Sequence, residues 1–373
     1  MRAFTPGGVA PLSGEDRLRP LRIAIVAPPW FEIPPKDYGG IELIVYNLVE
    51  GLVARGHEVT LIAAGENHTS ARFRATFDRA PAGLGELRGG TIERIHASRA
   101  DRIIGELDVD VVHDHTQAGP LTATGRLAPT VVTSHGPARG RLGEYYRSLG
   151  DAVRFVAISN AQRASAPDVP WIETVHNGID VDAYPFRDRK DDFLLFLGRV
   201  HPEKGVHLAI ETARAVGLPL VIAGKCSEPI EVEYFAREIE PRLGPGVTYV
   251  GVADQVRKKV LMAGTRALVF PICWEEPFGL VMVEAMACGT PVVALDRGAV
   301  PEVVSDGLTG YVCNAPEQLP EAVDAADAID PKACRAHVRA HFSAMRMTGC
   351  YEAVYMKALR GKATVGEAAV PAL

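Results

Sequence analysis

The chain has 373 residues, and its 40 lysines and arginines against 46 aspartates and glutamates give a formal net charge of −6. Apolar residues make up 47% and charged residues 23%, which is ordinary for a folded protein and excludes wholesale disorder. The mildly negative charge argues against nucleic acid as a partner, because such binding needs a strongly basic surface. A chain of this length is expected to form two domains without disulfide or metal staples.

Both ends of the chain are expected to be tails. Residues 1–20, rich in Gly, Pro and Arg, hold no apolar segment typical of a signal peptide and are expected to be disordered, and residues 362–373 have the same character. No window approaches about 18 consecutive apolar residues, so no integral membrane segment is expected. The six cysteines show neither a CxxC pair nor a zinc spacing, so we expect free thiols in a cytoplasmic protein.

In the first half, short apolar runs alternate with stretches of helical period. The expected strands are rich in Val or Ile and bounded by turn residues: Arg22–Ala27, Glu58–Ala64, Val109–His113, Thr130–Ser134 and Arg154–Ile158. Between the first two, apolar residues recur at helical spacing over Gly39–Arg55, and Gly56 ends this helix. The strand–helix–strand order predicts a parallel sheet with right-handed crossovers.

The same pattern restarts after Asp182–Asp192, which has little apolar content and is interpreted as a linker. The expected strands are Phe193–Leu197, Leu220–Ala223, Val247–Val250, Ala267–Pro271, Pro291–Ala294 and Gly310–Val312, with helices over Lys204–Val216 and Phe278–Cys288. The fold class is therefore α/β, with domains over 21–182 and 183–345. Ligands of open α/β sheets bind beyond the carboxyl ends of the strands, so a site in the cleft between two such domains is expected.

Two cations follow the strand Phe193–Leu197. Arg199 and Lys204 fall in a loop between this strand and a helix N-terminus, a place that suits a diphosphate. The plainer alternative is a solvated loop with two surface cations.

An acidic segment opens the helix after the strand Ala267–Pro271. Glu276 precedes Pro277, which suits a first helical turn, and Gly279 lets a ligand approach the free N–H groups there. Glu284 falls inside the helix among apolar neighbours, where its carboxylate needs a partner such as a ligand hydroxyl. Acids that complement the helix dipole explain Glu276 well but Glu284 poorly.

In the first domain, histidines and glycines stand at strand ends. His135, or His113 and His115 one strand earlier, would donate to a sugar hydroxyl or a developing charge, and a loop histidine held by backbone is the plainer alternative. The histidine pair has a zinc-like spacing without a third ligand, so no metal is expected. Gly39-Gly40 lies where phosphates are held but lacks the spacing of a dinucleotide or P-loop motif, which disfavours a nicotinamide dehydrogenase and a P-loop ATPase.

Taken in this order, the segments resemble family-4 glycosyltransferases of the GT-B fold. The resemblance runs from Leu21 to the 350s, and its most specific part is the E-x7-E element from Glu276 to Glu284. It implies two Rossmann-like α/β/α domains facing across a cleft, with a last helix over roughly 346–361 that returns to the first domain. It also implies a retaining hexosyltransferase that needs no cofactor or metal. The implied substrates are a nucleoside-diphosphate sugar, UDP favoured over GDP, and an unidentified hydroxyl acceptor.

The resemblance assigns most of the donor site to the second domain. Arg199 and Lys204 would hold the diphosphate and stabilise the leaving group in place of a metal. Glu284 would accept hydrogen bonds from the ribose, and Glu276 would hold hydroxyls of the donor sugar. The assignment is completed by the N–H groups of Phe278, Gly279 and Leu280 near the sugar and by Gly251 and Val252 near the base.

In the first domain, the resemblance implies that Gly39 and Gly40 approach the phosphates and that His135 touches the donor sugar near its reacting carbon. No general base is assigned, because the leaving phosphate could take the acceptor proton. The acceptor is expected on segments 30–38, 66–78 and 136–150, with Trp30, Tyr38, His113 and His115 as candidate contacts. For the basic-aromatic stretch Arg139, Arg141, Tyr145, Tyr146 and Arg147, an anionic acceptor, a peripheral membrane contact and a solvated surface all stay open.

Two other functions also stay open. One is a nucleotide-sugar epimerase of the same fold, which would need acids and bases around the sugar C2 position. The other is a non-catalytic nucleotide-sugar-binding protein, which would tolerate the loss of Arg199, Lys204 or Glu276, although all three are present.

Overall fold

The computed structural model describes residues 19–36, 39–81 and 90–366. Most of the predicted first tail, the candidate Tyr38 and residues 367–373 therefore lie outside the described residues. The chain divides into two compact units. The N-terminal unit comprises the residues up to Gly178 together with those from Ala344 onward, and the C-terminal unit comprises Ile179–Ser343.

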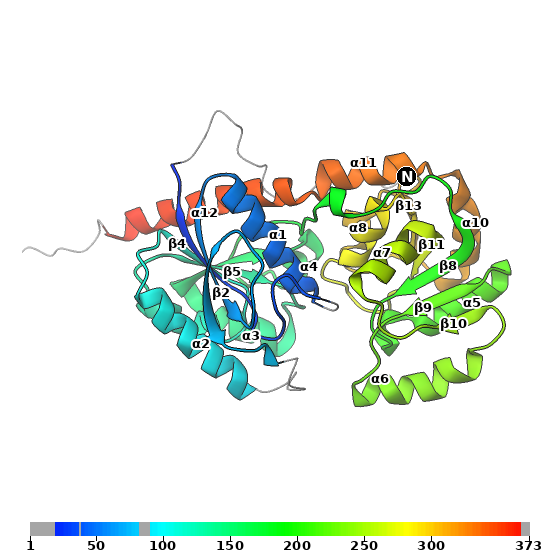
Figure 1. The fold of residues 1–373 in the computed structure, drawn as a ribbon, viewed down its shortest axis with the longest axis horizontal. Coiled ribbons are helices and arrows are strands. Elements are labelled where there is room, and N and C mark those ends of the chain that lie inside the picture. The colour runs from blue at the N-terminus through cyan, green and yellow to red at the C-terminus, as the bar shows by residue number, and fades with distance from the viewer. Residues whose placement is uncertain (1–18, 37–38, 82–89, 367–373) are drawn as a thin grey trace, which may run out of the picture. The chain divides into compact units, whose positions relative to one another are not determined.

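The N-terminal unit is built on a parallel sheet of seven strands in the order β3-β2-β1-β4-β5-β6-β7 (Figure 1). The strands are β1 Arg22–Val26, β2 Glu58–Ala64, β3 Arg72–Phe77, β4 Val111–Asp114, β5 Thr130–Ser134, β6 Val153–Ala157 and β7 Trp171–Thr174. The helices are α1 Gly40–Ala54, α2 Gly90–Gly105, α3 Gly140–Ser148, α4 Asn160–Ser165 and α12 Ala344–Gly366. Apart from Arg22 and Glu58 at their first positions, β1 and β2 are buried, and β5 is buried along its whole length, as strands covered on both faces should be.

The C-terminal unit has a parallel sheet of six strands in the order β10-β9-β8-β11-β12-β13. Its strands are β8 Asp191–Leu197, β9 Leu220–Ala223, β10 Val247–Tyr249, β11 Thr265–Phe270, β12 Val292–Leu295 and β13 Gly310–Cys313. Its helices are α5 Val206–Val216, α6 Pro229–Tyr234, α7 Gln255–Gly264, α8 Leu280–Ala287, α9 Val300–Val303, α10 Leu319–Ala325 and α11 Pro331–His341. The α/β class with two parallel sheets is thereby confirmed.

Each expected strand is confirmed to within two residues at either end, whereas β3 and β7 were not expected. Both are edge strands, and their sequences, RFRATF and WIET, carry charged residues in place of a continuous apolar run. The helix expected over Lys204–Val216 begins later, at Val206. Pro202–Lys204 form a separate 3₁₀ turn, because Gly205 adopts a left-handed conformation with φ of +71°.

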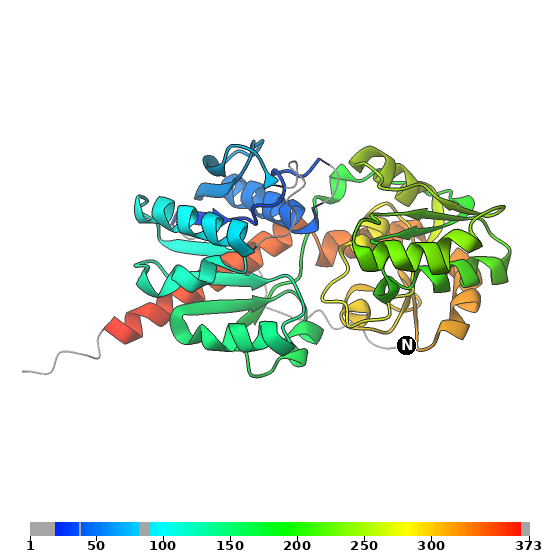
Figure 2. The same ribbon diagram turned by 90° about the horizontal axis from the view of Figure 1, so that it is seen from below.

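The last helix, α12, runs from Ala344 to Gly366 and is longer than expected. It therefore includes residues 362–366, which the sequence analysis assigned to a tail. Figures 1 and 2 show α12 lying along the N-terminal unit, where it packs against α1 and β5. Tyr351 and Tyr355 are fully buried there, and the Tyr351 hydroxyl lies 2.8 Å from Thr133 Oγ1.

The strand order of both sheets reverses beside the first strand of each unit. In the N-terminal unit β1 lies between β2 and β4, and in the C-terminal unit β8 lies between β9 and β11. Loops that leave these neighbouring strands diverge to opposite faces and leave a crevice at the carboxyl ends, where open α/β sheets bind ligands. Among the described residues, no helix is both long enough and apolar enough to cross a membrane.

Candidate functional site

In the C-terminal unit, the loops after β8 and β11 are held against each other by backbone contacts. The Cys273 N–H donates to the Glu203 carbonyl at 2.8 Å. A Cβ atom added to Gly205 would lie 2.0 Å from the Pro271 carbonyl oxygen, so only glycine permits this approach. The loop that carries the predicted cations is thus fixed beside the loop that carries the predicted carboxylates.

Lys204 and Glu276, predicted separately to face a ligand, are brought together. Lys204 Nζ lies 2.5 Å from Glu276 Oε2, and both side chains are largely buried. The Trp274 indole Nε1 donates to the same oxygen at 3.0 Å, and Lys204 Nζ lies 4.9 Å from the centroid of this indole ring. Since both donors use Oε2, Oε1 of Glu276 has no hydrogen-bond partner among the described residues and is left for a ligand. Sequence reasoning missed Trp274, although an indole two residues before Glu276 in a loop after a strand was a usable signal.

Arg199 is oriented by carboxylates that the sequence did not reveal. Its guanidinium lies 3.2 Å from Glu231 Oε1 and 3.9 Å from Glu228 Oε1. Glu231 is fully buried, and its Oε2 accepts the N–H groups of Ser227 and Glu228 at the start of α6. Although burial opposes ionisation, these hydrogen bonds and the nearby cations hold the pKa of Glu231 below its ordinary value. Arg199 is therefore held by a permanently charged anchor and keeps part of its guanidinium exposed.

Glu284 is buried on α8, and protein groups already bind it. The Tyr184 hydroxyl donates to Oε1 at 2.8 Å, and Lys258 Nζ lies 2.7 Å from the same oxygen. Burial and the neighbouring carboxylate raise the pKa of Tyr184 well above its ordinary value, so this phenol stays a hydrogen-bond donor. The carboxylate thus has partners that the sequence analysis did not foresee, one from α7 and one from the segment before β8.

Helix α8 begins at Leu280, one residue after the segment Glu276-Pro277-Phe278. Gly279, the residue before the helix, has φ of +77° and offers no side chain to cap the first N–H groups. A Cβ there would lie 2.6 Å from Met282 Cε. The free N–H groups at Gly279 and Leu280 follow from helix geometry, while Phe278 is buried. Gly251 accepts the Gly224 N–H after β10, and Val252 is exposed.

In the N-terminal unit, the glycine pair stands directly at the start of α1. A Cβ at Gly39 would lie 2.8 Å from Pro35 Cβ, whereas Gly40 has open space around it. Glu42 in the first turn is buried, and burial raises its pKa to about 7. The candidate Trp30 is half-buried in the loop after β1.

The three histidines cluster where β4 and β5 end. His113 is fully buried, with Nδ1 2.8 Å from the Tyr355 hydroxyl and Nε2 2.8 Å from Thr133 Oγ1. Both ring nitrogens of this buried side chain are thus engaged within the unit, which argues against the acceptor contact predicted for His113. His115 is buried, and its Nδ1 lies 2.9 Å from Nε2 of the half-buried His135.

The basic-aromatic stretch is split between surface and core. Arg139, Arg141 and Arg147 are exposed around α3. Tyr146 is buried in the core, and the Tyr145 hydroxyl donates to the Gln117 carbonyl. Tyr146 therefore packs within the unit, Tyr145 is half-buried, and the three arginines face solvent.

The described part of the chain contains no set of side chains suited to bind a metal ion. Within residues 19–36, 39–81 and 90–366, no group of three or more His, Cys, Asp or Glu side chains could hold a metal ion. All six cysteines are free thiols.

Two family models match the chain. The one described as Glycosyltransferase Family 4 matches residues 38–183, and the one described as Glycosyl transferases group 1 matches residues 183–335. Glycogen synthase from Mycobacterium tuberculosis is 27% identical, with 92% of this chain and 96% of that protein covered. Phosphatidyl-myo-inositol mannosyltransferase from Mycolicibacterium smegmatis is 28% identical, with 78% of this chain and 80% of that protein covered.

Solved structures agree with these matches. AviGT4, a glycosyltransferase involved in avilamycin A biosynthesis, superposes with a TM-score of 0.70 at 28% identity and covers 92% of this chain and 99% of its own. Anabaena HepE, solved in complex with UDP and glucose, has a TM-score of 0.71 at 17% identity and covers 90% of this chain and 99% of its own. The likeness to HepE shows the fold alone.

Proposed function

The chain belongs to the family-4 glycosyltransferases of the GT-B fold, and from this premise we propose that it is a retaining hexosyltransferase. In this proposal a sugar moves from a nucleoside-diphosphate sugar to a hydroxyl group of an acceptor, and the nucleoside diphosphate leaves. The observation that carries the proposal is the arrangement of Lys204, Glu276 and Arg199 at the β8–β11 switch point.

Departure of the nucleoside diphosphate builds negative charge on a phosphate oxygen and positive charge on the sugar ring. Lys204 and Arg199 are placed to neutralise the first of these, and their carboxylate partners hold them in position before the reaction. We therefore propose that these cations replace the metal ion that other transferases use. The side chain of Lys204 needs no large movement to serve, because loop packing and Trp274 already orient it.

The remaining contacts follow from the same chemistry. Glu276 accepts hydrogen bonds from donor-sugar hydroxyls through Oε1, since Lys204 and Trp274 occupy Oε2. Glu284 receives the ribose hydroxyls, and Tyr184 and Lys258 fix its carboxylate. In the N-terminal unit, His135 donates to the donor sugar. Gly40 leaves room for phosphates at the start of α1, and Gly39 allows the backbone conformation with φ of +149° that precedes it.

Retention follows in this proposal from attack on the face that the leaving group departs from. The leaving phosphate takes the acceptor proton, so no side chain is assigned as general base. Among donors, UDP-glucose is the first to test, because HepE binds UDP and glucose. The free thiols favour a reducing compartment such as the cytoplasm.

A donor panel tests the proposal. The protein is incubated with UDP-, GDP- and ADP-sugars, with and without EDTA, and release of nucleoside diphosphate is followed. We expect release from a UDP-sugar that EDTA does not abolish, and NMR of the product should show the anomeric configuration of the donor. No release from any donor, or conversion of the donor sugar to its C2 epimer, would contradict a transferase. An EDTA-sensitive rate would contradict metal independence alone.

A further inference from the structure

We propose that His115 is a positioning residue that sets the tautomer of His135, so that His135 carries its proton on Nδ1 and donates it to the donor sugar. The contact with the sugar rests on the proposed function, whereas the tautomer does not. The observation is the Nδ1···Nε2 distance of 2.9 Å between the two rings, which also stack at 5.2 Å between centroids.

The two rings share one proton in this hydrogen bond. Burial lowers the pKa of His135 to about 4 and the pKa of His115 well below its ordinary value, so both are neutral near pH 7. A neutral imidazole has one N–H and one bare nitrogen. Only two arrangements are therefore possible, one with His115 as donor and one with His135 as donor.

The surroundings of His115 decide between them. Its Nε2 is buried and has no hydrogen-bond partner among the described residues. If His135 were the donor, this Nε2 would carry a proton and become a buried N–H without an acceptor, which proteins almost never tolerate. If His115 donates through Nδ1, its Nε2 is instead a bare acceptor. The second arrangement is favoured, and it places the proton of His135 on Nδ1.

His135 Nδ1 is then a hydrogen-bond donor available to a ligand. Its ring makes no other hydrogen bond within the described part of the chain, and the residue is half-buried at the carboxyl end of β5. A neutral donor at this place suits a sugar hydroxyl, whereas a charged imidazolium would repel the positive charge that develops on the sugar ring.

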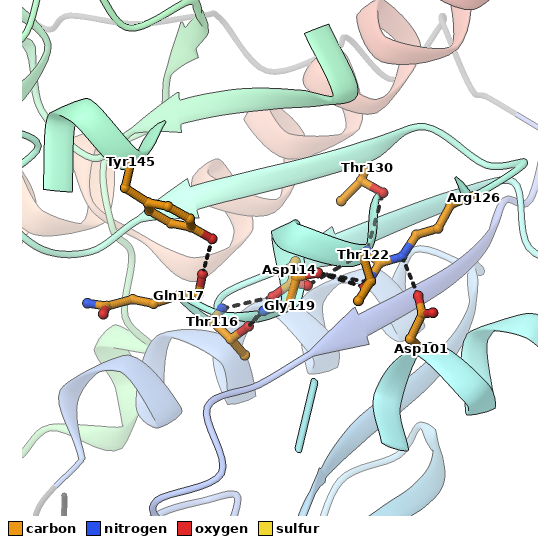
Figure 3. A network of polar contacts seen from close by, with 9 residues as sticks. All are labelled: Asp101, Asp114, Thr116, Gln117, Gly119, Thr122, Arg126, Thr130 and Tyr145. Atoms are coloured by element: carbon orange, nitrogen blue, oxygen red, sulfur yellow. Dashed lines mark hydrogen bonds and ion pairs between the residues drawn. The ribbon is translucent and has the colours of Figure 1, made fainter. Parts of the chain in front are cut away.

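Hydrogen bonds fix the loop that carries His115, and Figure 3 shows those made by its chain neighbours Asp114 and Thr116. Asp114 Oδ1 accepts both the N–H and the hydroxyl of Thr116, and the His115 N–H donates to the Val26 carbonyl. Farther along, the buried Arg126 donates to the Gly119 carbonyl at 3.1 Å.

Packing against His113 also fixes the ring of His115. The His113 ring lies 4.1 Å from that of His115, between centroids, and is itself held by Tyr355 and Thr133. The orientation of His115 is therefore set by the strand, by the loop and by helix α12, and it passes this orientation to His135.

The tautomer is measured directly by ¹⁵N NMR of the imidazole nitrogens in the full chain, with His135→Gln used to assign the His135 signals. We expect His135 to show a protonated Nδ1 and a bare Nε2. A protonated Nε2 on His135 would overturn the proposal, whether or not the protein turns over a sugar. UDP-glucose should shift the Nδ1 signal and UDP alone should not; equal shifts from both would overturn the sugar contact.

Activity provides the second readout. His115→Leu removes the hydrogen bond, and we expect kcat to fall by about 100-fold with little change in the donor KM. His115→Asn places an amide where Nδ1 stood and should restore most of kcat. An unchanged kcat in His115→Leu, or no recovery in His115→Asn, would overturn the positioning role.

His96 offers a matched control. It is equally buried in the same unit, with Nδ1 2.7 Å from Thr76 Oγ1 and Nε2 unpartnered among the described residues. His96→Leu should therefore leave kcat of the folded protein unchanged. An equal loss in both leucine variants would assign the effect to packing and overturn the proposal. If His115→Leu does not fold, the NMR measurement on the unsubstituted chain and His115→Asn still decide.

Discussion

The two switch points of the molecule use opposite chemistry. At the β8–β11 switch point of the C-terminal unit, each functional charge is held by an opposite one: Lys204 by Glu276, Arg199 by Glu231, and Glu284 by Lys258. Near the β1–β4 switch point of the N-terminal unit, the buried Asp114 also lies 3.8 Å from Arg126, but the candidate histidines are neutral and are joined to tyrosines and threonines by hydrogen bonds.

This difference fits the ligands that we propose for each region. Paired charges are stable while partly buried and can exchange partners with a charged ligand, as a diphosphate requires. Neutral buried groups can orient a ligand through hydrogen bonds without adding charge, which suits a sugar ring that becomes positive. In the proposed function, the unit that the group 1 model matches supplies charge, and the unit that the family 4 model matches supplies oriented hydrogen-bond donors.

The largest expected effect tests the charged region. Lys204→Ala should lower kcat/KM by about a thousandfold, or ~4 kcal/mol, because one preorganised contact to the leaving group is lost and Glu276 keeps an uncompensated charge. The assay is UDP release, with circular dichroism to verify folding. Lys332→Ala, an exposed lysine of the same unit, is the control and should be silent. Equal rates in both variants would remove Lys204 from the site.

Among the buried carboxyl groups that the structure describes in the N-terminal unit, Glu42 provides a test of the comparison. Glu42 is buried at the start of α1, and its pKa of about 7 lies above the ordinary value of 4.5. The folded state therefore binds this proton more tightly than the unfolded state, so its contribution to stability declines as pH rises from 4.5 to 7 and stays low above that.

Glu42→Gln should lack this decline. The free energy of unfolding of Glu42→Gln, relative to that of the unsubstituted protein, should rise by up to about 3 kcal/mol between pH 4.5 and pH 8. Urea denaturation at both pH values measures this difference. Glu58→Gln, at an exposed position on β2, serves as the control. A gain that does not grow with pH would show that Glu42 is ionised in the folded protein.

An intermediate effect sharpens the assignment of Glu284. Glu284→Gln should weaken UDP binding by about 30-fold, or ~2 kcal/mol, because a charge-assisted acceptor for the ribose is lost and Lys258 is left with an amide partner. Isothermal titration calorimetry measures it. Lys258→Met should weaken binding in the same direction, since it frees the carboxylate from its position. UDP affinity unchanged in Glu284→Gln would place the ribose elsewhere.

The smallest expected effect concerns Trp274. Trp274→Phe keeps an aromatic ring beside Lys204 but removes the N–H that binds Glu276 Oε2. One hydrogen bond to a carboxylate corresponds to about a tenfold loss in kcat/KM. Steady-state kinetics with a UDP-sugar measure it, and UDP affinity should stay the same. A loss of UDP affinity instead would mean that Trp274 contacts the nucleotide and not Glu276.

Much of the fold and part of the candidate site could be predicted from the sequence. The buried strands were recognisable because strands covered on both faces are continuous apolar runs. The edge strands β3 and β7 were not predicted, because charged residues interrupt their apolar residues. Arg199, Lys204, Glu276 and Glu284 were recognisable because each stands at a set distance after a strand or inside the helix that follows it. Such local spacing places a side chain at the carboxyl end of a sheet without knowledge of its neighbours.

The sequence by itself determined the α/β class and the side chains that reach the switch points. Only the tertiary structure decided how those side chains pair. Tyr184 meets Glu284 across 100 residues, and Tyr355 meets His113 across 242. Such partners decide whether a histidine keeps a ring nitrogen for a ligand, as His135 does and His113 does not among the described residues. Periodicity reports which face of an element is buried, but hydrogen-bond partners come from other elements, and only packing brings those elements together.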